Sequence, residues 1–243
     1  MVIKYFQKGF NYAQDGPGNR LVYHLSGCNM HCKWCANPEG MHQTPGTYRE
    51  EAVRDIAKAV LSARPMFFDG GGLTLTGGEV TVQLDAALGL PNMVHKAGIH
   101  TCVETNAATE RFCELLPLVD LLIADFKHPD PVLHKQYTGL GNALIADNLL
   151  KASNAGKEML IRIPLIHRIN DSDAALLGFQ AFFSEFASRN TVRVEILPYH
   201  EYGKDKWLKA YGHYDMSDAF VARERIAEFE AALSLTGISI VRT

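Results

Sequence analysis

Short apolar runs alternate with longer amphipathic stretches along most of the chain. The runs have the length of strands, and the stretches between them follow a helical period. The predicted strands are Leu21–Leu25, Leu73–Thr76, His100–Glu104, Leu121–Asp125, Met159–Pro164 and Val192–Leu197. The predicted helices are Arg49–Ala63, Val82–Lys96, Glu110–Leu116, Leu144–Ala155, Asp173–Ser188 and Ser217–Leu235. This alternation is typical of βα units on a parallel sheet.

The number of units favours an incomplete barrel. Six βα units end between positions 190 and 200, whereas a barrel of eight units takes about 250 residues, roughly 31 per unit. The remainder holds one predicted helix and a terminal strand or tail at Ile238–Val241. The fold is therefore predicted to be α/β, an incomplete (β/α)6 TIM-like barrel with parallel strands. No linker or repeat marks a boundary, so one domain is expected over residues 1–243.

Polar residues gather where the predicted strands end. In parallel βα barrels the carboxyl edge is where catalytic residues from different strands converge. We therefore expect one site at the C-terminal edge of the strands. Its residues are Cys28, Cys32 and Cys35, then Gly77, Gly78 and Glu79, then Glu104, Thr105 and Asn106, then Asp125 and Lys127, with Arg162 and His200 from the last two strands.

Three cysteines spaced C-x3-C-x2-C indicate the chemistry of this site. Cys28, Cys32 and Cys35 supply three thiolates within eight residues, and thiolates are the usual ligands of iron–sulfur clusters. A structural zinc ion is the alternative, with His24 or His31 as a fourth ligand. Zinc sites, however, normally use paired knuckles, and the chain has no second pair.

The two remaining cysteines are predicted to pack in the protein rather than to bind metal. Cys102 shares strand parity with Glu104, and Cys113 falls in a predicted helix. Free cysteine is common in cores.

Composition narrows the class of protein further. The net charge of −3 and the scattered Lys and Arg residues give no electrostatic footprint for nucleic acid or for an anionic membrane. The start of the chain has no signal-like segment, and no apolar run reaches the roughly 20 residues that span a bilayer. Five cysteines, an odd number, do not form a disulfide framework. We expect a cytoplasmic protein in a reducing compartment.

The segment Gly77-Gly78-Glu79 has two interpretations. Glycines at a strand end commonly form nothing more than a tight turn. Glycines also let a backbone approach a ligand, and a carboxylate accepts hydrogen bonds from an ammonium group. After a three-cysteine site, the second interpretation suits the amino-acid end of S-adenosylmethionine.

These segments resemble the radical S-adenosylmethionine enzymes, and among them the glycyl-radical-enzyme activases typified by the activase of pyruvate formate-lyase. The resemblance covers nearly the whole chain. The cysteine motif indicates the superfamily, and the segments around Asp15 and His200 indicate the activase branch. The matching segments are Asp15-Gly16-Pro17-Gly18, Gly27 to Pro38, Gly77-Gly78-Glu79, Glu104-Thr105-Asn106, Asp125-Phe126-Lys127 and Leu197 to Lys204.

The resemblance implies one [4Fe–4S] cluster and bound S-adenosylmethionine. Cys28, Cys32 and Cys35 would bind three irons, and the fourth iron would bind the amino and carboxylate groups of S-adenosylmethionine. Contacts with that molecule are implied for Trp34, Cys35, Ala36, Gly77, Gly78, Glu79, Glu104, Asn106, Asp125, Phe126, Lys127, Arg162 and His200. Glu104, Thr105 and Asp125 would form a monovalent-cation site, and Asp15 would contact a partner peptide.

Two positions depart from the type member of the family. Glu104 stands where that member has Asp, and Ala36 stands where it has His. Three residues also have structural interpretations of their own: Lys127 could be solvated, His200 could be a satisfied polar group, and Arg162 could pair with a carboxylate of the barrel.

The implied reaction is reductive cleavage of S-adenosylmethionine to a 5′-deoxyadenosyl radical, which abstracts the α-hydrogen of a glycine in a partner enzyme. The partner would be pyruvate formate-lyase or a related glycyl radical enzyme. The chain has no ferredoxin-like insert between Cys35 and Gly77, so flavodoxin or ferredoxin would supply the electron. We expect a monomer that is active only without oxygen. The alternatives are a radical enzyme with another substrate and a non-enzymatic iron–sulfur or zinc protein.

Overall fold

The structure is a computed structural model that describes residues 1–242. The chain forms two compact units, and each is described by itself. Unit one consists of Met1–Asn29, Glu39–Thr105 and Thr109–Ile123. Unit two consists of Met30–Pro38, Asn106–Ala108 and the chain from Ala124 onward.

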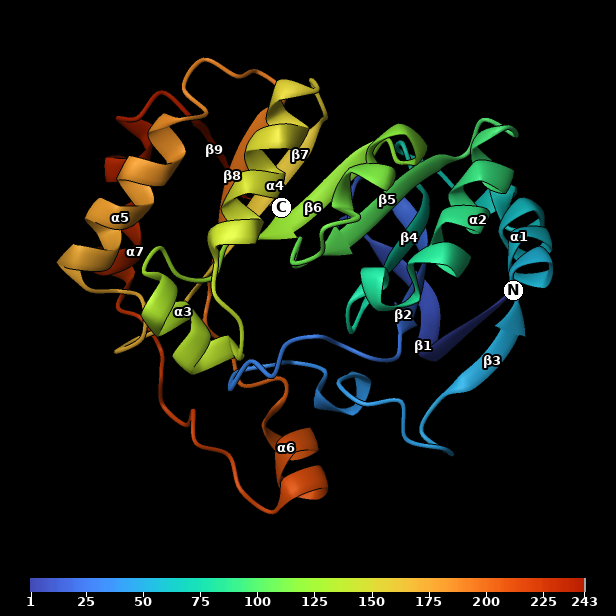
Figure 1. Cartoon of the computed structure of the whole chain (residues 1–243), viewed down its shortest axis with the longest axis horizontal. Helices are drawn as coiled ribbons and strands as arrows, with labels where there is room; N and C mark the ends of the chain where they lie inside the picture. Colours follow the sequence, from blue (N-terminus) through green and yellow to red (C-terminus); the bar gives the residue numbers. More distant parts are fainter. Residues whose placement is uncertain (243) are drawn as a thin grey trace. The chain divides into compact units, whose positions relative to one another are not determined.

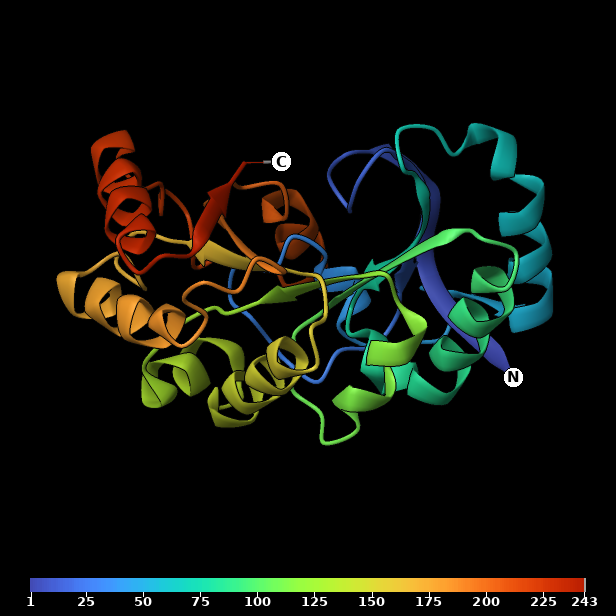
Figure 2. The same cartoon turned by 90° about the horizontal axis from the view of Figure 1, so that it is seen from above.

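Unit one contains a mixed sheet with helices beside it (Figure 1). Strands β2, β4 and β5 are parallel neighbours, and β1 pairs antiparallel with both β2 and β3. Helices α1 and α2 lie side by side in both views (Figures 1 and 2). The bounds are β1 Val2–Tyr12, β2 Asn19–Leu25, β3 Arg49–Ala52, α1 Val53–Ser62, β4 Gly72–Gly77, α2 Leu84–His95 and β5 His100–Thr105.

The pattern of buried residues explains these elements. Strand β2 is buried along almost its whole length, as expected for a parallel strand covered on both faces. Helix α1 buries Val53, Ile56, Ala57 and Val60, which recur at the spacing of one helix face. The sheet and α1 therefore share an apolar core.

Unit two has the same parallel character. Strand β6, Leu121–Asp125, begins in unit one and ends in unit two, and strands β7, β8 and β9 are parallel neighbours. Phe126 stacks on Phe182 of α5 with ring centroids 3.9 Å apart. The bounds are α3 Pro131–Thr138, α4 Ala143–Asn154, β7 Met159–Leu165, α5 Asp173–Ser184, β8 Val192–Pro198, α6 Lys204–Tyr211, α7 Arg223–Ser234 and β9 Ser239–Val241.

The predicted fold class is confirmed, because the protein is α/β and each of the two units contains neighbouring parallel strands. All six predicted strands are present, and the terminal strand is β9, parallel to β8. One domain over the whole chain stays a prediction. No helix within residues 1–242 has both the length and the apolar character needed to cross a membrane.

One predicted helix was wrong, and another begins later than predicted. The helix predicted from Arg49 begins at Val53, because residues 49–52 form strand β3 against β1. The helix predicted at Glu110–Leu116 is replaced by short 3-10 turns. Pro117 lacks a backbone donor and disfavours a helical residue before it.

Four elements were missed. Strands β1 and β3, and helices α3 and α6, were not predicted. Helix α6 fell in a stretch that contains both Gly203 and Gly212. Helix α3 is nevertheless marked by Asp130, whose side chain accepts from the backbone N–H groups of Val132 and Leu133 and caps the helix.

Candidate functional site

The turn after β2 places Cys28 in unit one. The backbone N–H of Cys28 donates to the carbonyl oxygen of Met41 (2.9 Å), and that of Gly27 donates to Gly40 (2.7 Å). The backbone N–H of Glu79 donates to the carbonyl oxygen of Gly27 (2.7 Å). The cysteine turn is therefore fastened to the end of the neighbouring strand β4.

Gly78 has a structural role in this turn. A Cβ atom at Gly78 would lie 2.2 Å from the carbonyl oxygen of Gly27 and 2.8 Å from that of Gly40. Gly77 has a φ of +109°, which a residue with a side chain rarely adopts. Both glycines are thus required by the approach of β4 to the cysteine turn. Their contact with S-adenosylmethionine stays a prediction.

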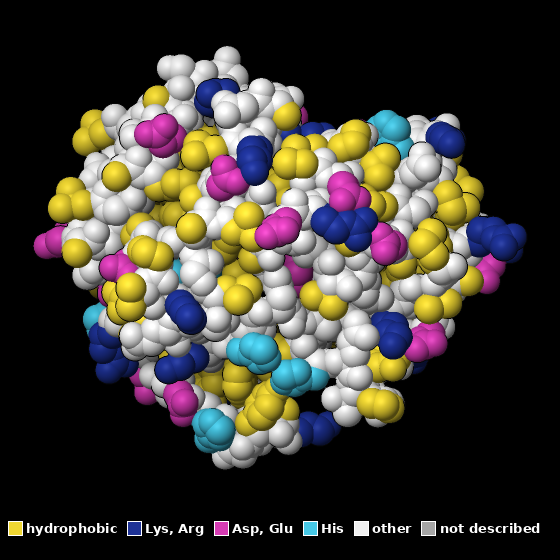
Figure 3. Space-filling view, viewed as in Figure 1, with side chains coloured by type: hydrophobic (Ala, Val, Ile, Leu, Met, Phe, Trp, Pro, Cys, Tyr) yellow, Lys and Arg dark blue, Asp and Glu magenta, His cyan; other side chains and the backbone are white. Residues whose placement is uncertain are grey.

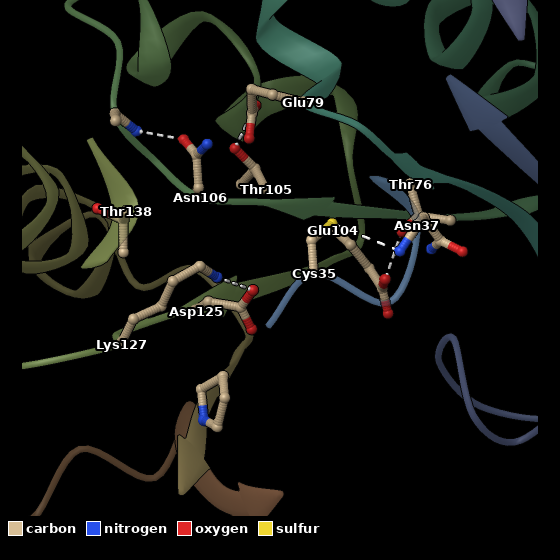
Figure 4. Close-up of polar contacts among 12 residues, drawn as sticks. Cys35, Asn37, Thr76, Glu79, Glu104, Thr105, Asn106, Asp125, Lys127 and Thr138 are labelled. Atoms are coloured by element: carbon tan, nitrogen blue, oxygen red, sulfur yellow. Dashed lines mark hydrogen bonds and ion pairs between the residues drawn. The ribbon is translucent and has the colours of Figure 1, made fainter. Parts of the chain in front are cut away.

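Glu79 is a fully buried carboxylate. Its Oε1 accepts from the backbone N–H of Thr81 (2.9 Å), from the hydroxyl of Thr81 (2.8 Å) and from the hydroxyl of Thr105 (2.7 Å). Figure 4 shows Thr105 directed at Glu79. Burial of a charge is costly unless such partners are present, so this network fixes the carboxylate in one orientation.

The three residues predicted to hold a monovalent cation have other partners. Thr105 donates to Glu79, and Glu104 accepts from the hydroxyl of Thr76. Successive side chains of a strand point to opposite faces, so the Glu104 and Thr105 side chains diverge. In unit two, Asp125 pairs with Lys127. The cation site stays a prediction.

Asp15 lies in a turn that Arg20 holds from within unit one. The Arg20 guanidinium is fully buried and donates to Oγ1 of Thr74 (2.6 Å) and to the carbonyl oxygen of Pro17 (3.0 Å). The hydroxyl of Thr74 donates to the carbonyl oxygen of Asp15 (2.7 Å). Burial lowers the pKa of Arg20. Arg20 was not predicted as a site residue, although Arg inside an apolar strand is an unusual signal.

Cys32 and Cys35 lie on one turn of unit two. The backbone N–H of Cys35 donates to the carbonyl oxygen of Cys32 (3.1 Å), and the N–H of Asn37 donates to Sγ of Cys35 (3.4 Å). The N–H of His31 donates to the carbonyl oxygen of Thr138 at the end of α3 (2.8 Å). Hydrogen bonds from the backbone therefore help to hold this loop, in which Cys32 and Cys35 lie outside any helix or strand.

Lys127 and Asp125 form an ion pair at the end of β6 (Figure 4). Lys127 is almost fully buried. Burial raises the pKa of the Cys32 thiol to about 12, and the charge of Lys127 opposes this increase. The Lys127 ammonium has three donors, so its pairing with Asp125 leaves the predicted contact with S-adenosylmethionine chemically feasible.

Arg162 has a structural partner that the sequence did not identify. Its Nε donates to Oε2 of Glu195 at 2.9 Å, and both side chains are buried. The two residues are opposite each other in the register of β7 and β8. Arg162 therefore pairs with a carboxylate of the sheet, which was its alternative interpretation. The contact of Arg162 with S-adenosylmethionine stays a prediction.

Three further predicted residues are placed as follows. The Phe126 side chain lies in the aromatic core against α5, so its predicted ligand contact can involve only its backbone. Asn106 Oδ1 accepts from the backbone N–H of Ala108 (3.0 Å). His200 stacks on the exposed Tyr202 (centroids 4.0 Å apart), and burial lowers the pKa of His200.

Trp34 and Ala36 flank Cys35 on the same loop. The Trp34 ring lies against Tyr137 of α3, with centroids 6.4 Å apart, and it packs against the buried cluster that contains Ile166 and Tyr199. Ala36 is approached closely by the backbone of Gly203. The predicted adenine contacts of Trp34 and Ala36 stay predictions.

Two further cysteines and two histidines were considered as packing residues or as additional ligands of a zinc ion. Cys102 is buried in β5, as predicted, and lies beside the Arg20 side chain of unit one. Cys113 was predicted to pack in a helix, which is wrong, because it is exposed on a 3-10 turn. His24 packs in β2 against the ring of Phe6, and His31 is exposed.

The residues around the thiols fit an iron–sulfur cluster. The five cysteines, all within residues 1–242, form no disulfide, and three of them lie on the loop between β2 and the segment at Asn37. The backbone N–H of Asn37 already points at Cys35 Sγ, and such N–H groups commonly donate to the sulfur atoms of clusters.

The surface drawn in Figure 3 mixes acidic and basic side chains, so this face shows no basic patch for nucleic acid.

A comparison with protein families defines the class. The model described as "Radical SAM superfamily" matches residues 22–179. This range contains the three-cysteine loop, the Gly77–Glu79 turn and strands β4 to β7.

Comparison with characterised relatives refines this assignment. The chain is 34% identical to a pyruvate formate-lyase-activating enzyme of Streptococcus mutans over 79% of this chain and 76% of that protein. It is 32% identical to that of Clostridium pasteurianum over 84% and 85%. A solved domain of the enzyme from Bacteroides vulgatus superposes with a TM-score of 0.57 at 25% identity, covering 70% of this chain and 98% of that one. The chain therefore belongs to the radical SAM superfamily, in the family of the pyruvate formate-lyase-activating enzymes.

Proposed function

We propose that this protein is an activase that installs a glycyl radical on a partner enzyme, with pyruvate formate-lyase as the first candidate. Membership of the family implies a [4Fe–4S] cluster and S-adenosylmethionine. When bound, the cluster would supply one electron for the reductive cleavage of S-adenosylmethionine to methionine and a 5′-deoxyadenosyl radical, the species that would take the glycine α-hydrogen.

The observation that carries this proposal is the loop after β2, which contains three closely spaced thiols. Cys28, Cys32 and Cys35 would bind three irons, and the Asn37 N–H on Cys35 Sγ supports that role. A fourth protein thiol is absent from the loop sequence, which leaves one iron for the amino and carboxylate groups of S-adenosylmethionine.

Further side chains of the chain would bind and orient S-adenosylmethionine. Glu79 would accept a hydrogen bond from its ammonium group, because this carboxylate is held in place by Thr81 and Thr105. Lys127 would meet its carboxylate, and Trp34 would lie against its adenine. Such positioning and the exclusion of water are the protein's contribution, since the cofactor carries the chemistry.

Partner and reductant follow from the same proposal. Asp15, on the turn held by Arg20 and Thr74, would contact the glycine-bearing peptide. The segment between Cys35 and Gly77 contains no further cysteine, so the electron would come from a flavodoxin or ferredoxin. We further propose that the enzyme acts as a monomer and that Glu104, Thr105 and Asp125 bind a monovalent cation.

The test is anaerobic reconstitution with iron and sulfide, followed by reduction in the presence of S-adenosylmethionine and pyruvate formate-lyase. We expect one 5′-deoxyadenosine for each glycyl radical, measured by chromatography and electron paramagnetic resonance. Cys35→Ala should abolish both products, whereas Cys113→Ala, which removes an exposed cysteine outside the loop, should retain them.

Three results would contradict parts of the proposal. One zinc ion and no sulfide would exclude a radical enzyme. Cleavage of S-adenosylmethionine without a glycyl radical on any tested glycyl radical enzyme would indicate another substrate. A cluster that never cleaves S-adenosylmethionine would favour an electron-transfer protein.

A further inference from the structure

The segment that begins helix α6 contacts the cysteine loop at three points within unit two. The indole Nε1–H of Trp207 donates to the carbonyl oxygen of Cys35 (2.9 Å). The Lys206 ammonium donates to Oδ1 of Asn37 (2.9 Å). The backbone of Gly203 is so close that a Cβ atom there would lie 2.4 Å from the same Cys35 oxygen.

Helix α6 is in turn anchored to the rest of unit two. The Trp207 ring packs near Tyr211 and Tyr214, with centroids 4.9 and 6.2 Å away. The hydroxyl of Tyr214 shares a 2.6 Å hydrogen bond with that of Tyr199, which follows β8. The Tyr199 hydroxyl also donates to the carbonyl oxygen of Met216 (2.6 Å). The position of Trp207 is therefore fixed by packing rather than by α6 alone.

Trp207 and Lys206 contact the loop on either side of one hydrogen bond, which joins Asn37 to the sulfur of Cys35. The N–H of Asn37 donates to Sγ of Cys35, and its direction depends on the backbone between these two residues. Trp207 holds the carbonyl group at one end of that backbone segment, and Lys206 holds the Asn37 side chain at the other.

We propose that Trp207 is a positioning residue for the iron–sulfur cluster: it holds the Cys35 carbonyl so that the Asn37 N–H stays directed at the Cys35 sulfur. This inference rests on the proposed function, because it assigns Trp207 to the same cluster. Hydrogen bonds to cluster sulfurs help to set the reduction potential. An N–H donor stabilises the more negative, reduced state, so its loss lowers the potential.

Trp207→Phe removes the indole N–H and keeps an aromatic ring between Tyr211 and Tyr214. Lys206→Met removes the second contact. Lys209→Met is the matched control, because Lys209 is exposed on the same helix. Circular dichroism and the thermal midpoint of each variant establish that it is folded.

The first measurement uses protein without the cluster. The alkylation rate of Cys35 by iodoacetamide is followed by peptide mass spectrometry, with the exposed Cys113 as the internal reference. Trp207→Phe should accelerate alkylation of Cys35 about fivefold, the factor that corresponds to one hydrogen bond, because a loop that has lost this contact opens more often to the reagent. Lys206→Met should change it in the same direction, and Lys209→Met should match the wild type.

The second measurement uses reconstituted protein. The reduction midpoint of the cluster should shift to a more negative potential in Trp207→Phe and stay unchanged in Lys209→Met. Wild-type values for both the alkylation rate and the midpoint in Trp207→Phe would overturn the proposal. Absence of glycyl radical formation in the wild type would contradict the proposed function instead, and it would leave the alkylation result intact.

Discussion

Arg162 and Glu195 form a buried ion pair across neighbouring parallel strands, with Nε of Arg162 2.9 Å from Oε2 of Glu195. The side chains are only 10% and 3% exposed. Charges buried to this extent are stable only with a well-placed partner. The pair joins β7 to β8 by side chains as well as by the backbone ladder.

Removal of the carboxylate from this pair should destabilise the fold. Glu195→Ala leaves the Arg162 guanidinium buried without its partner, and the expected loss in free energy of unfolding is about 3–5 kcal/mol. The double variant Arg162→Met/Glu195→Leu should recover most of that loss in urea titrations. If the double variant also retains full affinity for S-adenosylmethionine, the predicted ligand contact of Arg162 is excluded.

A methyl group at Gly78 should disrupt the turn that carries Cys28. The added Cβ would lie 2.2 Å from the Gly27 oxygen, so one of the two backbones must move. Gly78→Ala should lower the thermal midpoint and the iron bound after reconstitution. The control is Gly9→Ala, where nothing lies within 4 Å of the added atom. Equal iron content in the two variants would show that the turn tolerates the methyl group.

Loss of the Glu79 charge should weaken both the fold and ligand binding. Glu79→Gln replaces charge-assisted hydrogen bonds from Thr81 and Thr105 by neutral ones, at a cost of about 1–3 kcal/mol. If Glu79 also meets the ammonium of S-adenosylmethionine, the dissociation constant rises about tenfold by calorimetry. Thr105→Val removes one donor and keeps the charge, so it should affect stability more than affinity. Unchanged affinity in Glu79→Gln would assign the residue to the fold alone.

Four histidines should make the stability rise with pH between about 5 and 7. Burial is the first cause that lowers the pKa of each of them below the ordinary value of 6.5. The unfolded chain then binds more protons than the native protein as the pH falls through 6.5, so the native state loses stability. The four are His100, His128, His134 and His200.

Urea midpoints measured at steps across this range provide the check. His134→Gln, which replaces a fully buried ring, should reduce the slope of stability against pH. A flat profile for the wild type would mean that these histidines protonate as easily in the folded protein as in the unfolded chain.

The strand pattern was predicted well because the parallel strands are buried along their length. Runs such as Leu121–Asp125 and Val192–Leu197 contain enough apolar residues to be recognised locally. Strand β3 and helix α6 were not predicted, because local propensity does not select them. Residues 49–52 become a strand only through pairing with β1, and α6 is held by packing of Trp207 and Tyr214.

The sequence by itself determined the class of chemistry at the candidate site. Cysteine spacing and the order of Gly77, Glu79, Asp125 and Lys127 after successive strands are properties of the chain, and they indicated a cluster and its ligand before any fold was known. These motifs can be recognised from neighbouring residues alone, because each motif lies directly after its own strand.

Only the tertiary structure decided which polar residues hold the others in place. Glu195 faces Arg162, Arg20 holds the turn of Asp15, and Trp207 reaches Cys35 from 172 residues away in the chain. These partners are far apart in sequence, and no spacing rule connects them. They meet because the backbone brings buried donors to acceptors that would otherwise lose their hydrogen bonds to water.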